Sequence, residues 1–222
     1  MPAVRAPARL NLAAIEGSLR EVQDHHAHIQ DRLGGHRDPL DDRVIDNMLA
    51  GYVAVEALAA AGTDVFALGQ HRHLLELNTL VLCGPSEARR AAYARHLQAT
   101  EQRFYEEREA GIQDVVEWHV RHVDEPAWSR AAGVYVRMLS TPQLFIEGNH
   151  RTGALVMSYI LVRDGLPPFV LSVDNAAAYF EPSAVLRDLH KHSPAALFRV
   201  PGLRKRLAAL LRDQADQRYL RA

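Results

Sequence analysis

The feature that most constrains the fold is residues 155–163, a segment that is largely apolar around its circumference when it is drawn as a helix. Gly165 and the pair Pro167-Pro168 follow it and end the helix, because proline cannot continue the hydrogen-bond ladder. A helix without a polar face is stable only where other elements cover it on all sides. The sequence therefore predicts a central, buried helix.

Several other segments carry apolar residues on one side only, at the spacing of a helix. They are residues 44–53, residues 131–139 after Pro126, and residues 203–215. The stretch from Ser86 to Glu109 is polar, but it too repeats apolar residues at helical steps and predicts one long surface helix. The only short run with strand character, Phe169–Val173, is bracketed by turn residues. We therefore predict an all-α fold.

Length and composition indicate an ordinary globular protein of 222 residues with a net charge of -1. We expect one packed unit, divided into an N-terminal helical extension (1–65) and a core with the C-terminal helices (66–222). No apolar run approaches the roughly 18 residues of a membrane span, and no export signal is recognisable. Cys83 is the only cysteine and predicts a small buried side chain. A cytoplasmic protein with no membrane segment is expected.

Two groups of residues suggest partners but are weak signals. His25 and His28 share a helix face, as do His119 and His122, yet none of the twelve histidines forms a recognised metal-binding pattern. The basic C-terminal segment would attract nucleic acid or an acidic partner, although a solvated helix face explains it equally simply. We expect structural or exposed histidines and no nucleic-acid partner.

The segment that carries chemistry is Glu147 to Arg151, which enters the predicted central helix. Gly148 allows a tight turn there, and the first N–H groups and the dipole of the following helix attract an anion. Asn149 adds a side-chain donor, Arg151 a fork for a phosphate, and Glu147 a ligand for Mg²⁺ held with that phosphate. The alternative is a simple turn with a helix cap, in which Arg151 is an ordinary surface residue.

This segment resembles the motif of the Fic (Fido) family, His-x-Phe-x-(Asp/Glu)-Gly-Asn-Gly-Arg-x-x-Arg, with five of its eight specified positions matched. The similarity extends from Ala131 to Phe169 and includes Thr152-Gly153 within the motif, and it implies that these two residues bind the nucleotide phosphates together with Gly148, Asn149 and Arg151. The resemblance implies a Fic helical bundle that binds ATP with Mg²⁺ and transfers AMP to protein hydroxyls. The matched positions are Phe145, Glu147, Gly148, Asn149 and Arg151.

Three motif positions depart from the family. Gln143 replaces the histidine that serves as the base, and an amide cannot supply the roughly 10²–10⁴-fold of general-base catalysis. Ala154 replaces the second arginine, which in the family contacts the γ-phosphate and pairs with an inhibitory glutamate. His150 replaces a glycine, so its ring either obstructs the anion site or supplies a displaced base or phosphate ligand.

Two further features of the family are altered. Ile15-Glu16-Gly17 is similar to its inhibitory helix motif, in which Glu16 would be the inhibitory glutamate, but Leu12 stands at the Ser/Thr position. The family's flap, a β-hairpin that aligns the target protein, should lie between residues 81 and 112, where no hairpin signal occurs. A helix in place of the flap would change how a target docks.

The sequence thus favours a Fic-fold nucleotide- or phosphate-binding protein that is impaired in AMP transfer. One alternative is a regulatory interaction module that uses the helix at residues 86–109 and the basic C-terminal helix as partner surfaces. Another is a diverged phosphotransferase that uses His150. The expected partners are a nucleotide or phosphate ligand, a protein target or regulator, and a second copy in a homodimer.

Overall fold

The computed structural model describes residues 9–33 and 40–221, so residues 1–8 and 34–39 of the predicted N-terminal extension lie outside it. Within these ranges the chain is helical, and its only β-type contacts are two isolated bridges, Leu10 with Leu220 and Thr141 with His190. The prediction of an all-α fold is confirmed. None of the helices in the described ranges is long and apolar enough to cross a membrane.

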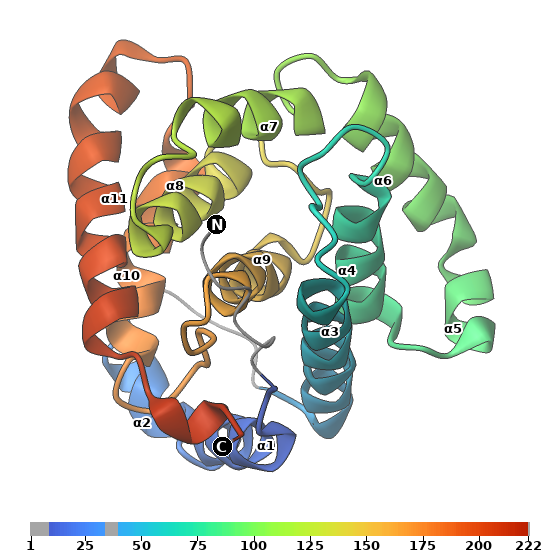
Figure 1. Cartoon of the computed structure of the whole chain (residues 1–222), viewed down its shortest axis with the longest axis vertical. Coiled ribbons are helices and arrows are strands. Elements are labelled where there is room, and N and C mark those ends of the chain that lie inside the picture. Colours follow the sequence, from blue (N-terminus) through green and yellow to red (C-terminus); the bar gives the residue numbers. More distant parts are fainter. Residues whose placement is uncertain (1–8, 34–39, 222) are drawn as a thin grey trace, which may run out of the picture.

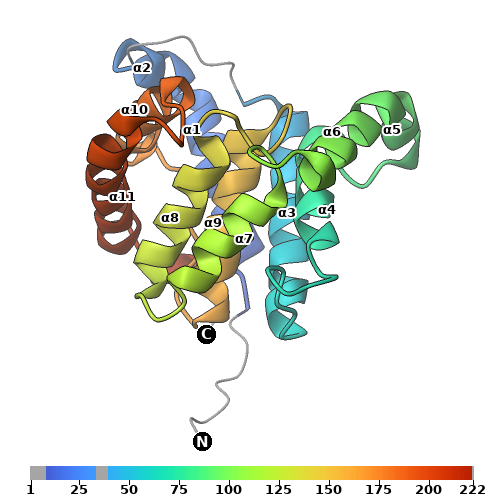
Figure 2. The same ribbon diagram turned by 90° about the horizontal axis from the view of Figure 1, so that it is seen from above.

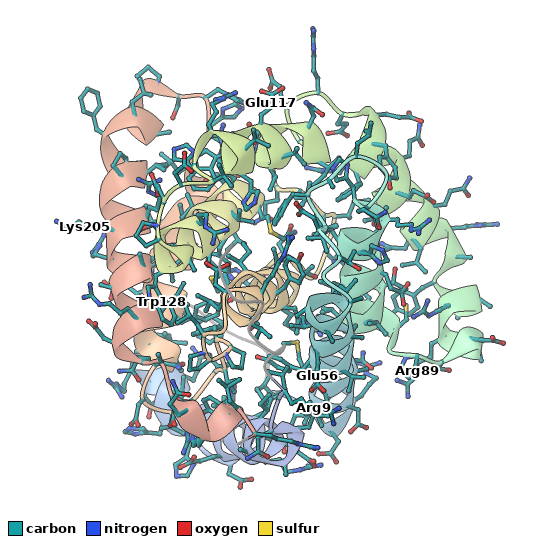
Figure 3. All side chains as sticks on the ribbon, viewed as in Figure 1. Arg9, Glu56, Arg89, Glu117, Trp128 and Lys205 are labelled. Carbon is teal, nitrogen blue, oxygen red and sulfur yellow. The ribbon has the colours of Figure 1, made fainter. Side chains whose placement is uncertain are left out.

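In chain order the helices are α1 (Leu12–Asp24), α2 (His26–Asp31), α3 (Asp42–Ala60), α4 (Arg72–Cys83), α5 (Glu87–Ala92), α6 (Ala94–Glu106), α7 (Ile112–Arg121), α8 (Ala127–Leu139), α9 (Asn149–Arg163), α10 (Ala176–Asp188), α11 (Pro194–Asp213) and the 3₁₀ helix η1 (Gln217–Tyr219). The C-terminal helix α11 packs on α8, and Lys205 projects from its outer side (Figure 3).

Helix α9 is the centre of the molecule. Figure 1 shows it end-on, with α3, α4 and α8 around it, and these three helices contact it. Every residue from Thr152 to Val162 is buried, and the helix ends at Arg163, followed by the C-cap Asp164 and by Gly165, whose φ is 75°. The predicted central helix is therefore confirmed, together with the residue that stops it.

Two glycines allow helices to approach closely around this centre. A Cβ added at Gly153 of α9 would lie 2.6 Å from Cδ2 of Tyr135 on α8. A Cβ added at Gly133 of α8 would lie 1.8 Å from Cη2 of Trp118 on α7. Ordinary carbon–carbon contacts are about 3.5–4.0 Å, so α7, α8 and α9 can stack at these distances only because the side chains are missing.

The N-terminal helices share the core of the rest of the chain. Leu10 and Ile15 belong to the same buried apolar cluster as residues of α8, α9 and α11. The Leu10 N–H donates to the Glu56 carboxylate on α3 at 2.9 Å, and Figure 3 shows Glu56 beside the start of the described chain. Asn11 N–H donates to the Tyr219 carbonyl at 2.8 Å. Residues on both sides of position 65 thus form one core, while the boundary itself remains a prediction.

The prediction of one long helix from Ser86 to Glu109 is wrong in one respect, because the chain bends at Tyr93 between α5 and α6. Phe104 of α6 is fully buried and stacks on Phe145, whereas α5 buries no residue and is held to α4 by the Arg90–Glu76 ion pair at 2.6 Å. The two halves of the predicted helix, α5 and α6, are thus anchored to different parts of the molecule. In Figure 2 both helices project to the side opposite α10 and α11.

Candidate functional site

The loop between α8 and α9 ends in a glycine turn. Gly148 has a φ of 76°, in the left-handed region that favours glycine, and precedes α9 as its N-cap residue. A Cβ there would also lie 3.0 Å from Nδ2 of Asn78 and 3.2 Å from Cγ1 of Val81. No side chain caps the first turn of α9, so the positive end of its dipole is available to an anion.

Asn149 uses its side chain inside the loop. Its Oδ1 accepts the Phe145 N–H at 2.9 Å, and its Nδ2 donates to the Phe145 carbonyl at 2.7 Å and to Gln143 Oε1 at 3.2 Å. The residue is buried. The Asn149 amide thus holds the loop in shape, and donation from it to a bound anion stays a prediction.

Gln143 is integrated into the same network. Its Nε2 donates to the Leu139 carbonyl at 3.2 Å, and its Oε1 accepts from Asn149. Its backbone carbonyl accepts from Nη2 of Arg103 on α6 at 2.7 Å, which fixes α6 against the loop. The side-chain amide of Gln143 is therefore hydrogen-bonded at both ends.

Thr152 and Gly153 lie beneath the loop. Asn78 on α4 donates to Thr152 Oγ1 at 3.0 Å and to the Glu147 carbonyl at 2.9 Å. Thr152 is fully buried, and Gly153 packs on the Tyr135 ring. In the structure these residues contact Asn78 and Tyr135, and phosphate binding by them stays a prediction.

The start of the loop is fixed by a buried group of charges. Asp114 on α7 pairs with Lys191 Nζ at 3.1 Å and with Arg137 Nη2 at 2.7 Å. The Lys191 N–H in turn donates to the Thr141 carbonyl at 2.8 Å, and the Thr141 N–H donates to the Leu189 carbonyl at 3.1 Å. Burial lowers the pKa of Lys191, and Asp114 opposes this effect. This group ties the loop before α9 to the loop before α11.

A cavity of about 470 Å³ lies beside the first turn of α9. Three predicted site residues line it together: Glu147, His150 and Arg151. The remaining lining comes from α3 and the residues just before it, from the end of α4, from the bend between α5 and α6, and from α10. These residues are Leu40, Asp41, Arg43, Val44, Asn47, Leu82, Tyr93 and Phe180.

Arg151 is held at the cavity wall by the last turn of α4. Its Nη1 donates to the Val81 carbonyl at 3.3 Å, and Asn47 donates to the same carbonyl at 3.1 Å. That carbonyl belongs to the negative end of the α4 dipole, which suits a guanidinium group. Arginine carries five N–H donors, so this anchored side chain can also bind a phosphate at the cavity.

Glu147 presents an exposed carboxylate to the same cavity. Mg²⁺ in nucleotide sites is usually bound through one or two carboxylates together with the phosphates, so a single glutamate fits that chemistry. Across the part of the chain that the structure describes, no group of three or more His, Cys, Asp or Glu side chains converges on a metal site. A Mg²⁺ ion held by Glu147 would take its other ligands from nucleotide phosphates and from water.

His150 lies among aromatic rings. Its Nδ1 is 3.1 Å from the Tyr135 hydroxyl, its carbonyl accepts from the Tyr179 hydroxyl at 2.9 Å, and Phe180 lies edge-on to its ring. His150 also borders a second, smaller cavity of about 60 Å³, whose lining is mostly apolar and includes Ala154. The alanine at the second arginine position thus faces apolar surroundings.

Glu16 lies on α1 and pairs with Arg20 of the same helix at 2.7 Å, with 39% of its side chain exposed. Arg20 also reaches Asp42 at 3.4 Å. Among the described residues that line the two cavities, Glu16 does not occur. The inhibitory role remains a prediction, and the observed partner of this carboxylate is a neighbouring arginine.

Sequence reasoning missed Asn78, Arg43 and Tyr93. Asn78 had a signal, because a polar residue in the apolar stripe of α4 must find buried partners. Arg43 and Tyr93 had none, since each reaches the cavity only through the tertiary fold.

The similarities to known proteins agree with the motif. The chain is 28% identical over 119 residues to the protein adenylyltransferase fic-1 of Caenorhabditis elegans, which covers 48% of this chain and 23% of that protein. It is 30% identical over 106 residues to fic-1 of Caenorhabditis briggsae, and this match covers 42% of this chain and 20% of that protein. No protein-family model and no solved structure matches. The chain thus spans less than a quarter of these relatives and is distantly similar to Fic-1 adenylyltransferases.

Proposed function

We propose that this protein is a Fic-type nucleotide-binding protein, in which the cavity beside α9 binds the phosphates of a nucleotide such as ATP. The observation that supports this most strongly is that Glu147, His150 and Arg151 line one cavity at the uncapped start of a long helix. Arg151 would bind a phosphate through its guanidinium group, and Glu147 would bind Mg²⁺ with that phosphate. The similarity to protein adenylyltransferases supports the same assignment.

We further propose that AMP transfer by the histidine-dependent route is impaired. In that reaction a target hydroxyl oxygen bonds to the α-phosphorus, the bond to pyrophosphate breaks, and a base takes the hydroxyl proton. Gln143 cannot take that proton, and its amide is already engaged by Leu139 and Asn149. Loss of a general base costs about 10²–10⁴-fold in rate. Nucleotide binding does not need this group and would persist.

The test is titration calorimetry of the full chain with ATP, ADP and AMP, with and without Mg²⁺. We expect measurable binding that Arg151→Ala weakens by about tenfold, as expected for a charge-assisted hydrogen bond. Arg121→Ala is the matched control, because Arg121 pairs with Glu117 on the surface of α7, away from the cavity (Figure 3). Absence of binding by all three nucleotides would reject the proposal and favour an interaction module.

An assay with radiolabelled ATP tests the second part. Strong labelling of the protein itself or of a target, abolished by Arg151→Ala, would contradict the proposed impairment. A working phosphotransferase that uses His150 is the second candidate, favoured by the Tyr135 hydroxyl that holds His150 Nδ1 at the cavity wall. It predicts activity that disappears in His150→Ala and survives in Gln143→Ala.

A further inference from the structure

The cavity has a second wall that the Fic-like motif does not provide. It is made by Arg43 and Asn47 of α3 and by Tyr93 at the bend between α5 and α6. These residues come from two parts of the chain, α3 and the α5–α6 bend, which are both far in sequence from Glu147 and Arg151. The fold nevertheless brings them to one cavity, which gives it a cation and an aromatic ring in addition to the motif residues.

Arg43 is suited to bind phosphate. Its only ion pair among the described residues is with Asp41, at 3.5 Å, and its side chain remains 56% exposed. Asp41 is occupied at its other oxygen, because Oδ1 accepts the Val44 N–H and caps α3 at 2.7 Å. A weak, exposed pair of this kind contributes little stability, so the guanidinium group can turn toward a phosphate at low cost. Arg151 would then face a second arginine across the cavity.

Tyr93 is suited to bind a planar group. The bend that carries it contains neither glycine nor proline, and the bonds Tyr93 N–H to Arg89 carbonyl and Leu97 N–H to Tyr93 carbonyl are both kept at 3.0 Å. Local sequence therefore does not require the bend. Its consequence is that a tyrosine with 42% exposure lies at the edge of the phosphate cavity. Nucleobases stack on such rings, whatever their hydrogen-bonding pattern.

We propose that Arg43 and Tyr93 complete the nucleotide site, with Arg43 binding the phosphate chain opposite Arg151 and Tyr93 stacking on the base. This assignment rests on the proposed nucleotide-binding function. In this assignment the base is covered by the bend between α5 and α6, which lies in the segment where the family's β-hairpin flap was expected. Stacking on a tyrosine selects a planar base and distinguishes poorly between purines and pyrimidines.

The experiment measures binding of Mg²⁺-ATP and of Mg²⁺-pyrophosphate, which lacks a base, to the full chain by calorimetry. Tyr93→Ala should weaken ATP binding by about tenfold and leave pyrophosphate binding within about twofold of the parent. Arg43→Ala should weaken both ligands by about tenfold, because both carry phosphates. Tyr93→Phe keeps the ring and should match the parent.

Two variants serve as matched controls. Tyr105→Ala removes a tyrosine of α6 that is 49% exposed and does not line the cavity, and Arg89→Ala removes a cation of α5 at the outer edge of the molecule (Figure 3). Both should bind ATP as the parent does. Tyr93→Leu, with circular dichroism of every variant, repeats the test with a bulkier apolar side chain should Tyr93→Ala fail to fold.

The outcomes separate the two proposals. If the parent binds neither ligand, the nucleotide-binding function itself fails, and this assignment fails with it. If the parent binds ATP but the tyrosine variants bind it equally well, or lose ATP and pyrophosphate to the same extent, Tyr93 does not stack on the base. If Arg43→Ala retains full affinity for both ligands, Arg43 does not bind the phosphates. Either result overturns the assignment while the nucleotide site stands.

Discussion

Replacing Gly153 by alanine tests whether the close contact between α8 and α9 limits this fold. The new Cβ would lie 2.6 Å from Cδ2 and 2.9 Å from Cε2 of Tyr135, whereas carbon atoms normally approach to about 3.5–4.0 Å. The ring or the helix must therefore move by about 1 Å. Tyr135 is 1% exposed, bonded to His150 and packed on Tyr179, so the ring has no open space to enter.

Two effects oppose each other in this variant. Overpacking of a core costs about 1–3 kcal/mol, and replacing glycine by alanine inside a helix stabilises it by up to about 1 kcal/mol. We expect the steric cost to exceed the gain, with a net loss of about 1–2 kcal/mol. For a chain of this size that corresponds to a fall in Tm of about 2–8 °C.

Gly17→Ala is the matched control, because Gly17 lies inside α1 and its added Cβ would meet nothing within 4 Å. This variant gains the same helix propensity without a clash, so its Tm should rise slightly. Scanning calorimetry of the parent and both variants measures the difference. If Gly153→Ala raises the Tm as much as Gly17→Ala does, the contact with Tyr135 does not constrain the packing and the reasoning is wrong.

Three further predictions concern the core and the loop. His119 is 8% exposed and burial lowers its pKa to about 4, so the unfolded chain binds more protons between pH 6.5 and 4. The free energy of unfolding should therefore be largest above pH 6.5 and fall by about 2–3 kcal/mol toward pH 4, as measured by urea titration, and His119→Gln should remove most of that fall. Asp114→Asn removes the carboxylate that Lys191 and Arg137 share, and should cost about 3–5 kcal/mol in the same assay; a loss below about 1 kcal/mol would contradict a structural role. Asn149→Ala removes the bonds to Phe145 and Gln143 and should lower the Tm while making the loop a preferred site of limited proteolysis; unchanged cleavage there would show that other contacts hold the loop.

The sequence predicts the central helix because its signal is local. A segment with apolar residues on every side, bounded by Gly148 and Gly165, has one stable environment, and α9 occupies it. The bend at Tyr93 has no such signal, since no glycine or proline interrupts residues 87–106. It arises because α5 is anchored to α4 while α6 is anchored to Phe145. Anchors of this kind are tertiary contacts, which periodicity does not report.

In the candidate site, too, some features could be predicted from the sequence and others could not. Glu147 and Arg151 could be predicted as cavity residues because a glycine turn at a helix start places its neighbours at the dipole end. Asn149 and Thr152 are equally visible in the motif, but the sequence does not show that Asn149 bonds to Gln143 at the start of the motif or that Thr152 bonds to Asn78 of α4. A motif therefore identifies which residues are close together and leaves open which of them face a ligand.

This division explains why the loop can retain its shape while its chemistry changes. The positions that match the Fic pattern include Gly148, which forms the turn, and Asn149, which holds the loop on Phe145. The positions that differ from the pattern make contacts of their own. Gln143 bonds to Asn149, although its amide cannot act as a base, and His150 bonds to Tyr135. A loop that keeps its supports can lose a reacting group without unfolding. The expected result is a site that binds phosphate more readily than it transfers it.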